Sequence, residues 1–433
     1  MEIKIENNNS LESIYLNEVG RAANGAILYK KGKAVLLATI VTDINANIED
    51  DFLPLTVQYI EKSYANGKFP GGYVKREGKP NEFEILTSRL IDRSLRPLFP
   101  KSYRYPVQIT IMVLSVDNDL DLQIMALNAA SIALFVSNLP IHRAINAIRI
   151  GKIDDDFIIN PTLEQMKQSS IDLFISGENE NIFMIEFKSN IGELSEDKML
   201  EAIKLAQKYI NTTSQIYLQN LSSHIKPHLK IDFEDSNFNI DIFNTIKEKY
   251  GTMLESCFLN MAKNENAAFL NNAIKDITNN ENYNQIEVEI AVSKIKREFI
   301  RNKILNEEMR LDGRGLDTIR DINILTNILP NAHGSTLFTR GQTQVLAVCT
   351  IGNDSDMQSY EMLTSKYPLK SNFIFHYNFP SFSTGEVYPI GSVSRRELGH
   401  GNLARKALES SIRGDNRAIR IVSEVLESNG SSS

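Results

Sequence analysis

The chain has 433 residues, which is too many for one hydrophobic core, so we expect two or three domains. Its 42% hydrophobic and 23% charged residues are ordinary for a globular protein in water, and its net charge of −7 argues against a general coating of nucleic acid. No apolar run reaches the roughly 18 residues of a membrane span, and the N-terminus has no basic segment followed by an apolar one. Only Cys257 and Cys349 are present, which excludes a disulfide framework. We therefore expect a cytoplasmic protein without a membrane partner.

The first distinctive segment covers residues 62–104. It holds ten Lys/Arg and four Asp/Glu, a local charge of +6 in a chain of −7. This inversion of charge is typical of a site for a polyanion. Its glycine-rich first half predicts a mobile loop that presents Tyr73 beside Lys75 and Arg76.

The second half of this segment predicts a short helix. Arg89, Arg93 and Arg96 are spaced i, i+4, i+7, so they share one helix face, and Pro97 ends the helix. A solvated basic face is the alternative interpretation of three such arginines. The adjoining basic loop and its aromatic residue favour the polyanion site.

The middle of the chain changes character. Residues 171–188 predict a hairpin, and the helix after it places Met199, Ile203, Ala206 and Ile210 on one side. Residues 229–249 are acidic and Asn-rich, which predicts a linker, and residues 250–310 predict helices.

Two parts of the chain repeat one another. Residues 24–38 and 333–347 match at an offset of 309, and each predicts a strand, a glycine turn and a second strand. A second echo follows in the same order, which makes an internal duplication a better interpretation than chance. In this echo Phe69-Pro70 answers Phe379-Pro380, and Glu84-Ile85 and Leu90 answer Glu397-Leu398 and Leu403. We therefore predict a first α/β core (1–215), a helical connector (216–308) and a second core (309–433).

The second copy contains a possible site for phosphate chemistry. Arg396 and His400 are i, i+4 and would share a helix face, and Arg395 and Arg396 are planar cations suited to phosphate oxygens. His400 titrates near neutrality and could donate a proton or a hydrogen bond. The chain ends ESNGSSS, where Ser431, Ser432 and Ser433 could offer backbone N–H and hydroxyl groups to an anion.

Each of these features has a plain alternative: a surface arginine pair, a structural histidine, a loose serine tail. The ordered set HYNFP, SRRELGHG and ESNGSSS is far more specific, as is YVKR followed by the helix that ends RSLRPLFP. Together they resemble the polynucleotide phosphorylase family over nearly the whole chain, most weakly at 215–300. The resemblance implies an α/β (α+β) fold in which two RNase PH-like cores flank an all-helical domain, with the second core truncated.

The resemblance also implies roles for single residues. Arg395, Arg396 and His400 would face the scissile linkage, and Ser431, Ser432 and Ser433 would hold the attacking phosphate. The RNA-binding residues would be Tyr73, Lys75, Arg76, Arg89, Arg93 and Arg96. Two positions depart from the family loop. Val74 replaces an aromatic residue, so a base-stacking surface worth about 1–3 kcal/mol is expected to be missing. Lys75 keeps the charge of arginine but lacks its planar fork.

The implied activity is phosphorolytic 3′-to-5′ degradation of single-stranded RNA to nucleoside diphosphates, reversible to polymerisation, with inorganic phosphate as co-substrate. The implied metal is Mg²⁺ or Mn²⁺, held by an aspartate pair expected beyond Ser433. We therefore expect the chain alone to be inactive, with the strand at 418–426 left as an exposed edge of the second core. Implied partners are two further copies in a trimeric ring and an RNA-degradation complex. Two alternatives stay open: a non-catalytic RNA-binding scaffold and a hydrolytic nuclease of the same fold.

Overall fold

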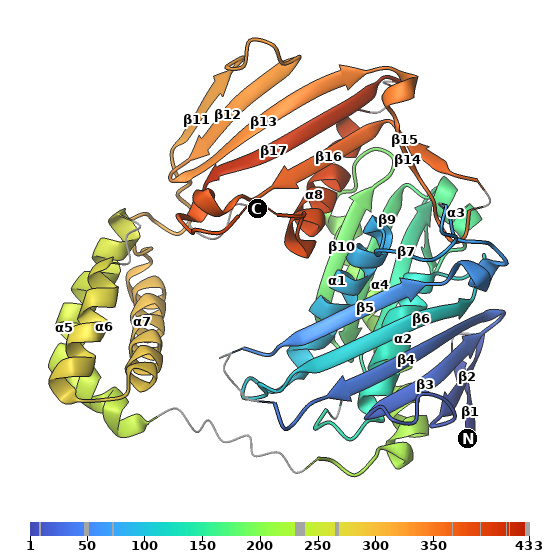
Figure 1. The fold of residues 1–433 in the computed structure, drawn as a ribbon, viewed down its shortest axis with the longest axis horizontal. Helices are drawn as coiled ribbons and strands as arrows, with labels where there is room; N and C mark the ends of the chain where they lie inside the picture. The colour runs from blue at the N-terminus through green and yellow to red at the C-terminus, as the bar shows by residue number, and fades with distance from the viewer. Residues whose placement is uncertain are drawn as a thin grey trace.

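The computed structural model describes residues 1–7, 10–46, 52–71, 73–141, 143–229, 239–264, 268–365, 367–389, 391–412, 414 and 416–428. Two α/β cores lie against each other, the first in blue to green and the second in orange to red (Figure 1). A bundle of three helices stands beside them in yellow-green to gold (Figure 1). This order of core, helical domain and core confirms the predicted fold class.

The first core is built on a six-stranded sheet in the order β1-β2-β3-β4-β6-β5. Only β5 and β6 run parallel to each other. Along β4 buried positions alternate with less buried ones, which is the pattern of a strand with one face toward the core. The strands are β1 (Glu2–Asn7), β2 (Ser10–Leu16), β3 (Gly25–Lys31), β4 (Ala34–Thr42), β5 (Leu55–Glu61) and β6 (Val107–Ser115).

A second, antiparallel sheet completes this core in the order β10-β9-β7-β8. Helix α2 (Leu122–Phe135) contacts both sheets, and all its residues except Gln123 are buried, as expected for a helix that is apolar all round. Helix α4 (Glu196–Leu221) covers β7 and β9. The remaining elements are α1 (Glu82–Leu95), α3 (Leu163–Gln168), β7 (Asn146–Ile153), β8 (Asp156–Ile159), β9 (Ile171–Glu178), β10 (Asn181–Ser189) and the 3-10 turns η1 (Ser63–Asn66), η2 (Arg96–Leu98) and η3 (Ser222–His224).

The helical bundle consists of α5 (Ile240–Asn264), α6 (Ala268–Glu281) and α7 (Gln285–Glu307), with an apolar core of its own. The predicted linker at 229–249 is wrong from Ile240 onward, because α5 begins there and buries Ile242 and Ile246. Residues 230–238 of that prediction lie outside the described residues. The predicted boundary after residue 215 falls inside α4, whose Tyr217 and Leu221 join the apolar core of the first core. We accordingly place the end of the first core after that helix. Among the helices of the described residues, none has the length and apolar character that crossing a membrane requires.

The second core has a five-stranded sheet in the order β11-β12-β13-β17-β16, covered at β16 by α8 (Arg395–Leu408). A two-stranded ribbon, β14 with β15, extends from it. The elements are β11 (Ile322–Thr326), β12 (Gly334–Arg340), β13 (Thr343–Gly352), β14 (Gln358–Tyr360), β15 (Leu369–Ser371), β16 (Phe373–Asn378), β17 (Ala418–Glu427), η4 (Asp354–Asp356), η5 (Ser381–Thr384) and η6 (Glu409–Ile412).

The predicted duplication is confirmed strand by strand. The order β2-β3-β4-β6-β5 recurs as β11-β12-β13-β17-β16, and the last pair of each is the parallel one. An irregularity in pairing recurs at the same place, between Val35 and Leu36 and between Gln344 and Val345. The hairpin glycines have left-handed φ angles of 54° at Gly32 and 59° at Gly341, a conformation that favours glycine.

Half of the second sequence echo is wrong. Glu84 and Glu397 do correspond, because each carboxylate caps its helix and accepts a backbone N–H at the end of the preceding strand, from Glu61 and from Phe379, both at 2.8 Å. The counterpart of Phe379 is therefore Glu61. Phe69 follows η1, whereas Phe379 precedes η5, so the Phe-Pro match was a coincidence of composition.

The predicted exposed edge at 418–426 is also wrong. Strand β17 lies inside the sheet, antiparallel to β13 on one side and parallel to β16 on the other. The prediction expected the partners of this strand to follow it in the sequence, whereas both of them precede it.

Candidate active site at the junction of the two cores

The two cores meet where α1 crosses α8, the corresponding helices of the two copies. Both helices start with a capping box, Asn81 with Glu84 and Ser394 with Glu397, which fixes where each helix begins. At the crossing the side chain of Arg89 lies on Gly399, where a Cβ would come within 2.6 Å of Arg89 Cδ. Glycine at 399 thus permits a charged side chain of one core to reach into the other.

Four basic side chains gather around this crossing. Burial lowers the pKa of His400, and Arg89, Arg396 and Arg93 lower it further. Burial also lowers the pKa of Arg89, with Arg93 and Arg396 adding to the effect. Arg89 and Arg93 from the first core therefore share one positive field with Arg396 and His400 from the second.

His400 is held as an uncharged ring in this field. Its edge meets the ring of Tyr377 at a centroid distance of 5.3 Å, and its Nδ1 is buried without a hydrogen-bond partner among the described residues. A neutral imidazole carries one N–H donor and one acceptor nitrogen, so His400 can hydrogen-bond an incoming group without adding to the local charge.

The predicted pair Arg395 and Arg396 points to two different neighbours. Arg395 Nη1 donates to the carbonyl oxygen of Val57 in the first core at 2.9 Å, which anchors α8 to β5. The guanidinium of Arg396 lies over the ring of Phe379, 5.0 Å from its centroid, in a cation–π arrangement. Of the pair, only Arg396 contributes to the positive field around His400.

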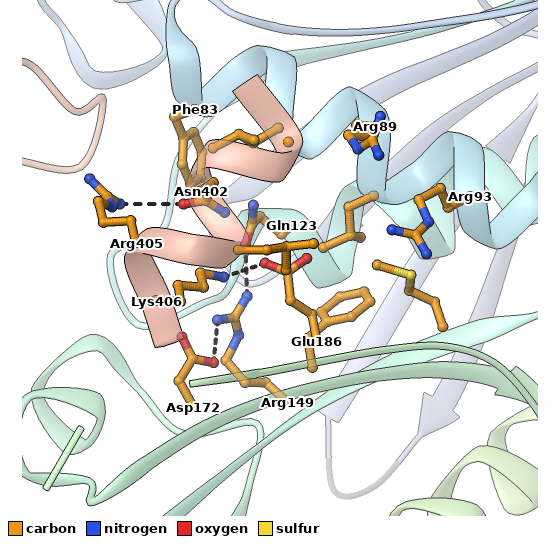
Figure 2. Close-up of a pocket in the computed structure, with 16 residues that line it drawn as sticks. Phe83, Arg89, Arg93, Gln123, Arg149, Asp172, Glu186, Asn402, Arg405 and Lys406 are labelled. Carbon is orange, nitrogen blue, oxygen red and sulfur yellow. Dashed lines mark hydrogen bonds and ion pairs between the residues drawn. The ribbon is translucent and has the colours of Figure 1, made fainter. Parts of the chain in front are cut away.

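The predicted arginine trio on α1 is also divided. Arg89 and Arg93 line a cavity beside α8, and both are visible in Figure 2. Arg96 does not line it. Its guanidinium pairs with Asp92 at 2.7 and 2.9 Å and donates to the carbonyl of Leu53 at 3.0 Å. These bonds tie the end of α1 to the chain before β5.

The predicted RNA loop lies apart from this cavity. The side chains of Tyr73, Lys75 and Arg76 are all exposed, and none lines the cavity. Lys75 has a left-handed φ of 51°, which turns the loop sharply just after its aromatic residue. The loop thus presents one aromatic ring and two cations to solvent.

The cavity between the cores has a volume of about 220 Å³. Lys406 of α8 forms an ion pair with Glu186 of β10 (Figure 2). Lys188 of β10 also pairs with Glu409 at 3.0 Å, so two ion pairs link the two cores. Arg149 lies beneath, bound to Asp172 at 2.6 Å. Sequence reasoning missed these residues because ion pairs between distant segments leave no local pattern. The spacing of Gly399 and Gly401 was the one available signal of close packing on α8.

The implied metal does not fit this part of the site. Mg²⁺ and Mn²⁺ prefer oxygen ligands, above all carboxylates, whereas the side chains around His400 are arginines. The two carboxylates that line the cavity, Asp172 and Glu186, are paired with Arg149 and Lys406. Among the described residues no group of three or more His, Cys, Asp or Glu could hold a metal ion. The predicted phosphate-binding residues Ser431, Ser432 and Ser433 lie outside the described residues.

Three protein-family models match these regions of the chain. A model of the 3′ exoribonuclease family, domain 1, matches residues 13–140 and 318–433, more than half of the chain and part of both copies. A model of domain 2 of that family matches 144–209, and one of the RNA binding domain of polyribonucleotide nucleotidyltransferase matches 241–315.

Relatives that match over nearly the whole chain point to the same family. A Helicobacter hepaticus protein named polyribonucleotide nucleotidyltransferase is 51% identical over 441 residues, covering 100% of this chain and 62% of the relative. A Wolinella succinogenes protein of the same name is 47% identical over 460 residues, covering 98% of this chain and 62% of the relative. The chain thus spans about 62% of the length of these relatives. They confirm the resemblance to polynucleotide phosphorylases.

One solved structure is an Archaeoglobus fulgidus exosome with RNA bound to the active site. It is 16% identical with a TM-score of 0.39, and the match covers 49% of this chain and 88% of that chain.

Proposed function

Because the chain belongs to the 3′ exoribonuclease family, we propose that it carries the core of a phosphorolytic enzyme that degrades single-stranded RNA from its 3′ end. Inorganic phosphate is the co-substrate, nucleoside diphosphates are the products, and the reaction is reversible. The observation that carries the proposal is the convergence of Arg89 and Arg93 from one core with Arg396 and His400 from the other.

This cluster suits phosphorolysis on electrostatic grounds. An oxygen of free phosphate attacks the terminal phosphorus of the RNA, a new P–O bond forms, the bond to the 3′ oxygen breaks, and that oxygen takes a proton. Two phosphate groups repel each other strongly at bonding distance, so fixed cations are needed to bring them together and to stabilise the charge of the transition state. Arg89 and Arg396 can each bind phosphate oxygens through two N–H groups, and neutral His400 can donate one more hydrogen bond.

The exposed loop supplies the approach for RNA. Tyr73 can stack on a base, and Lys75 and Arg76 can contact phosphates without reading sequence. The helical bundle coincides with the matched RNA-binding model, and its helix α7 carries Arg297 and Arg301. A phosphate site at Ser431–433, a role for Mg²⁺ or Mn²⁺, a homotrimeric ring, partners in an RNA-degradation complex and a cytoplasmic location belong to the same proposal. Each rests on the family resemblance.

The test is phosphate-dependent release of ADP from poly(A). In a chain continued to the length of its curated relatives, Arg396→Ala is expected to lower the rate by about 10²–10³-fold, the usual cost of one preorganised donor to the transition state. The control is Arg21→Ala, an exposed arginine in the turn between β2 and β3.

Other outcomes select other functions. An unchanged rate in Arg396→Ala would remove this residue from the site. RNA binding with no phosphate-dependent turnover in the longer chain would indicate a non-catalytic scaffold. Release of AMP without added phosphate would indicate a hydrolytic nuclease.

A further inference from the structure

The duplication gives each core a pocket at the same place, between the end of a strand and the start of the helix that crosses the core junction. In the second core this pocket has a volume of about 620 Å³ and is lined by Phe379, Ser381 and Arg396 among others. Its counterpart in the first core has about 660 Å³ and is lined by Glu61 and Ser63. The match extends to a 3-10 turn in each pocket that ends in a left-handed glycine, η1 at Gly67 and η5 at Gly385.

Among the described residues, only the first core's pocket is lined in part by a segment of the other core. Residues 361–365, here called the plug, come from the second core between β14 and β15 and line the first core's pocket. The ribbon that carries them reaches across to the first core at the right of Figure 1. The side chain of Leu363 is only 9% exposed and joins the main apolar cluster of the first core.

Polar contacts hold the plug by its backbone. Lys68 Nζ donates to the carbonyl oxygens of Met362 at 3.4 Å, of Leu363 at 3.0 Å and of Ser365. Asn66 Nδ2 donates to the carbonyl of Leu363 at 2.7 Å. The backbone of Lys68 and of its counterpart Glu386 makes the same turn, donating to Ser63 at 3.0 Å and to Ser381 at 3.1 Å. A carboxylate cannot donate to carbonyls, so the second pocket has no equivalent of this anchor.

A carboxyl group lies directly under the plug. Glu61, at the end of β5, accepts a hydrogen bond from the hydroxyl of Tyr59 at 2.8 Å and another from the backbone N–H of Leu363. The charged groups that face it are Glu84 of α1 and Lys68, and Glu361 of the plug lines the same pocket. The counterpart of Glu61 is Phe379, so the titratable group is specific to the plugged copy.

We propose that residues 361–365 dock the second core onto the wall of the first core's pocket and that Glu61 is the pH-sensitive latch of this docking. The plug is seated while the Glu61 carboxyl is protonated and is released as it ionises. The device sets how firmly the two cores hold each other, and it does not depend on the proposed function.

The direction in which docking of the plug depends on pH follows from the environment of Glu61. Burial under the plug raises the pKa of Glu61 from 4.5 to about 7, with Glu84 adding to the rise, while the bonds from Tyr59 and Leu363 and the charge of Lys68 oppose it. With the plug removed, this carboxyl would face water and return toward its ordinary value. Docking therefore takes up a proton, is strongest below pH 4.5, and is lost as pH rises through about 7.

The test is hydrogen exchange at the Leu363 amide in the 433-residue chain, divided at each pH by the intrinsic exchange rate of that amide. In the wild type this ratio should be flat below pH 4.5 and rise by up to about tenfold per pH unit between pH 4.5 and about 7, because releasing the plug releases one proton in that range. Above that range it should level off, because the Glu61 carboxyl is then ionised whether the plug is docked or released. Glu61→Gln should give a ratio that does not change with pH. Lys68→Met should raise the ratio at every pH and keep the wild-type slope.

The matched control is Glu386→Gln, which changes the carboxylate at the counterpart of Lys68 and should leave the wild-type curve as it is. A wild-type ratio that is constant from pH 4.5 to 7, or a Glu61→Gln variant that keeps the slope in that range, would overturn the latch. A Lys68→Met variant with unchanged exchange would overturn the anchor. None of these outcomes depends on RNA or phosphate, so failure here is distinct from failure of the proposed activity.

Discussion

Two histidines of the second core, His400 and His376, have pKa values lowered by nearby arginines, but the arginines differ. Burial lowers the pKa of His400, followed by the charges of Arg89, Arg396 and Arg93. Burial also lowers the pKa of His376, followed by Arg420, whose Nη2 lies 3.2 Å from His376 Nδ1, while Glu82 acts in the opposite direction. Each imidazole is thus neutral at pH 7, but different side chains keep it so.

This difference gives a prediction at the level of single residues. Arg89→Ala should raise the pKa of His400 and leave that of His376 unchanged, whereas Arg420→Ala should do the reverse. The measurement is an NMR titration of the imidazole carbons in histidine-labelled protein. If Arg89→Ala moved neither histidine, the shared positive field at the core junction would be disproved.

The lowered pKa values of His400 and His376 also make the stability of the folded chain depend on pH. A histidine whose pKa is lower in the folded chain takes up its proton less readily there than in the unfolded chain. As pH falls below about 6.5, the unfolded state gains protons first, so the contribution of His400 and His376 to stability declines in that range.

At the level of elements, the end of α1 was predicted from the sequence, but its crossing with α8 was not. Asn81 before Glu84 is a capping signal, and Pro97 ends α1 where predicted. What makes α1 and α8 neighbours is a glycine on one and a long cation on the other, more than 300 residues apart. Gly399 on its own looks only like a weak point in a helix.

The crossing predicts that a larger residue at position 399 destabilises the protein. Gly399→Ala would place a Cβ against the middle of the Arg89 side chain, so the expected cost is about 1–3 kcal/mol of unfolding free energy, as for overpacking in general. The loss should be seen as a lower denaturation midpoint of the cores in urea. Removing the long side chain in the double variant Arg89→Ala/Gly399→Ala should recover most of it.

A matched glycine substitution in the helical bundle should have the opposite effect on the free energy of unfolding. Gly251 lies in α5 with open space around its Cα, so Gly251→Ala should stabilise that helix by about 0.5–1 kcal/mol. If Gly399→Ala also proved stabilising, the close approach of Arg89 would not be a feature of the folded protein.

For the whole molecule, the order of domains and the duplication could be predicted because both depend on patterns that recur along the chain. The glycine hairpins at Gly32 and Gly341 are local and repeat at a fixed offset. The plug, the ion pair of Lys406 with Glu186 and the central place of β17 could not be predicted, because each joins segments that are distant in sequence. The predicted linker failed for another reason: Ile242 and Ile246 are too few apolar residues to stand out in an acidic segment.

The helical bundle has its own apolar core, built only from residues of α5, α6 and α7 and the turns between them. We therefore expect it to fold and unfold independently of the two cores. Phe258 is fully buried at the centre of that core, where its ring lies 5.8 Å from that of Phe299. Phe258→Ala should cost about 3–5 kcal/mol, which is about all that a core of this size supplies.

The variant should consequently lose the bundle and keep the cores. Hydrogen exchange is expected to become fast throughout α5–α7, while the amides of α2 between the two sheets of the first core remain protected. Ile132→Ala, in the middle of α2, is the matched change. It should speed exchange in the first core and leave α5–α7 protected, since Ile132 belongs to the first core alone. If Phe258→Ala also released α2, the bundle and the cores would form one cooperative unit, and the cores could not hold their junction without it.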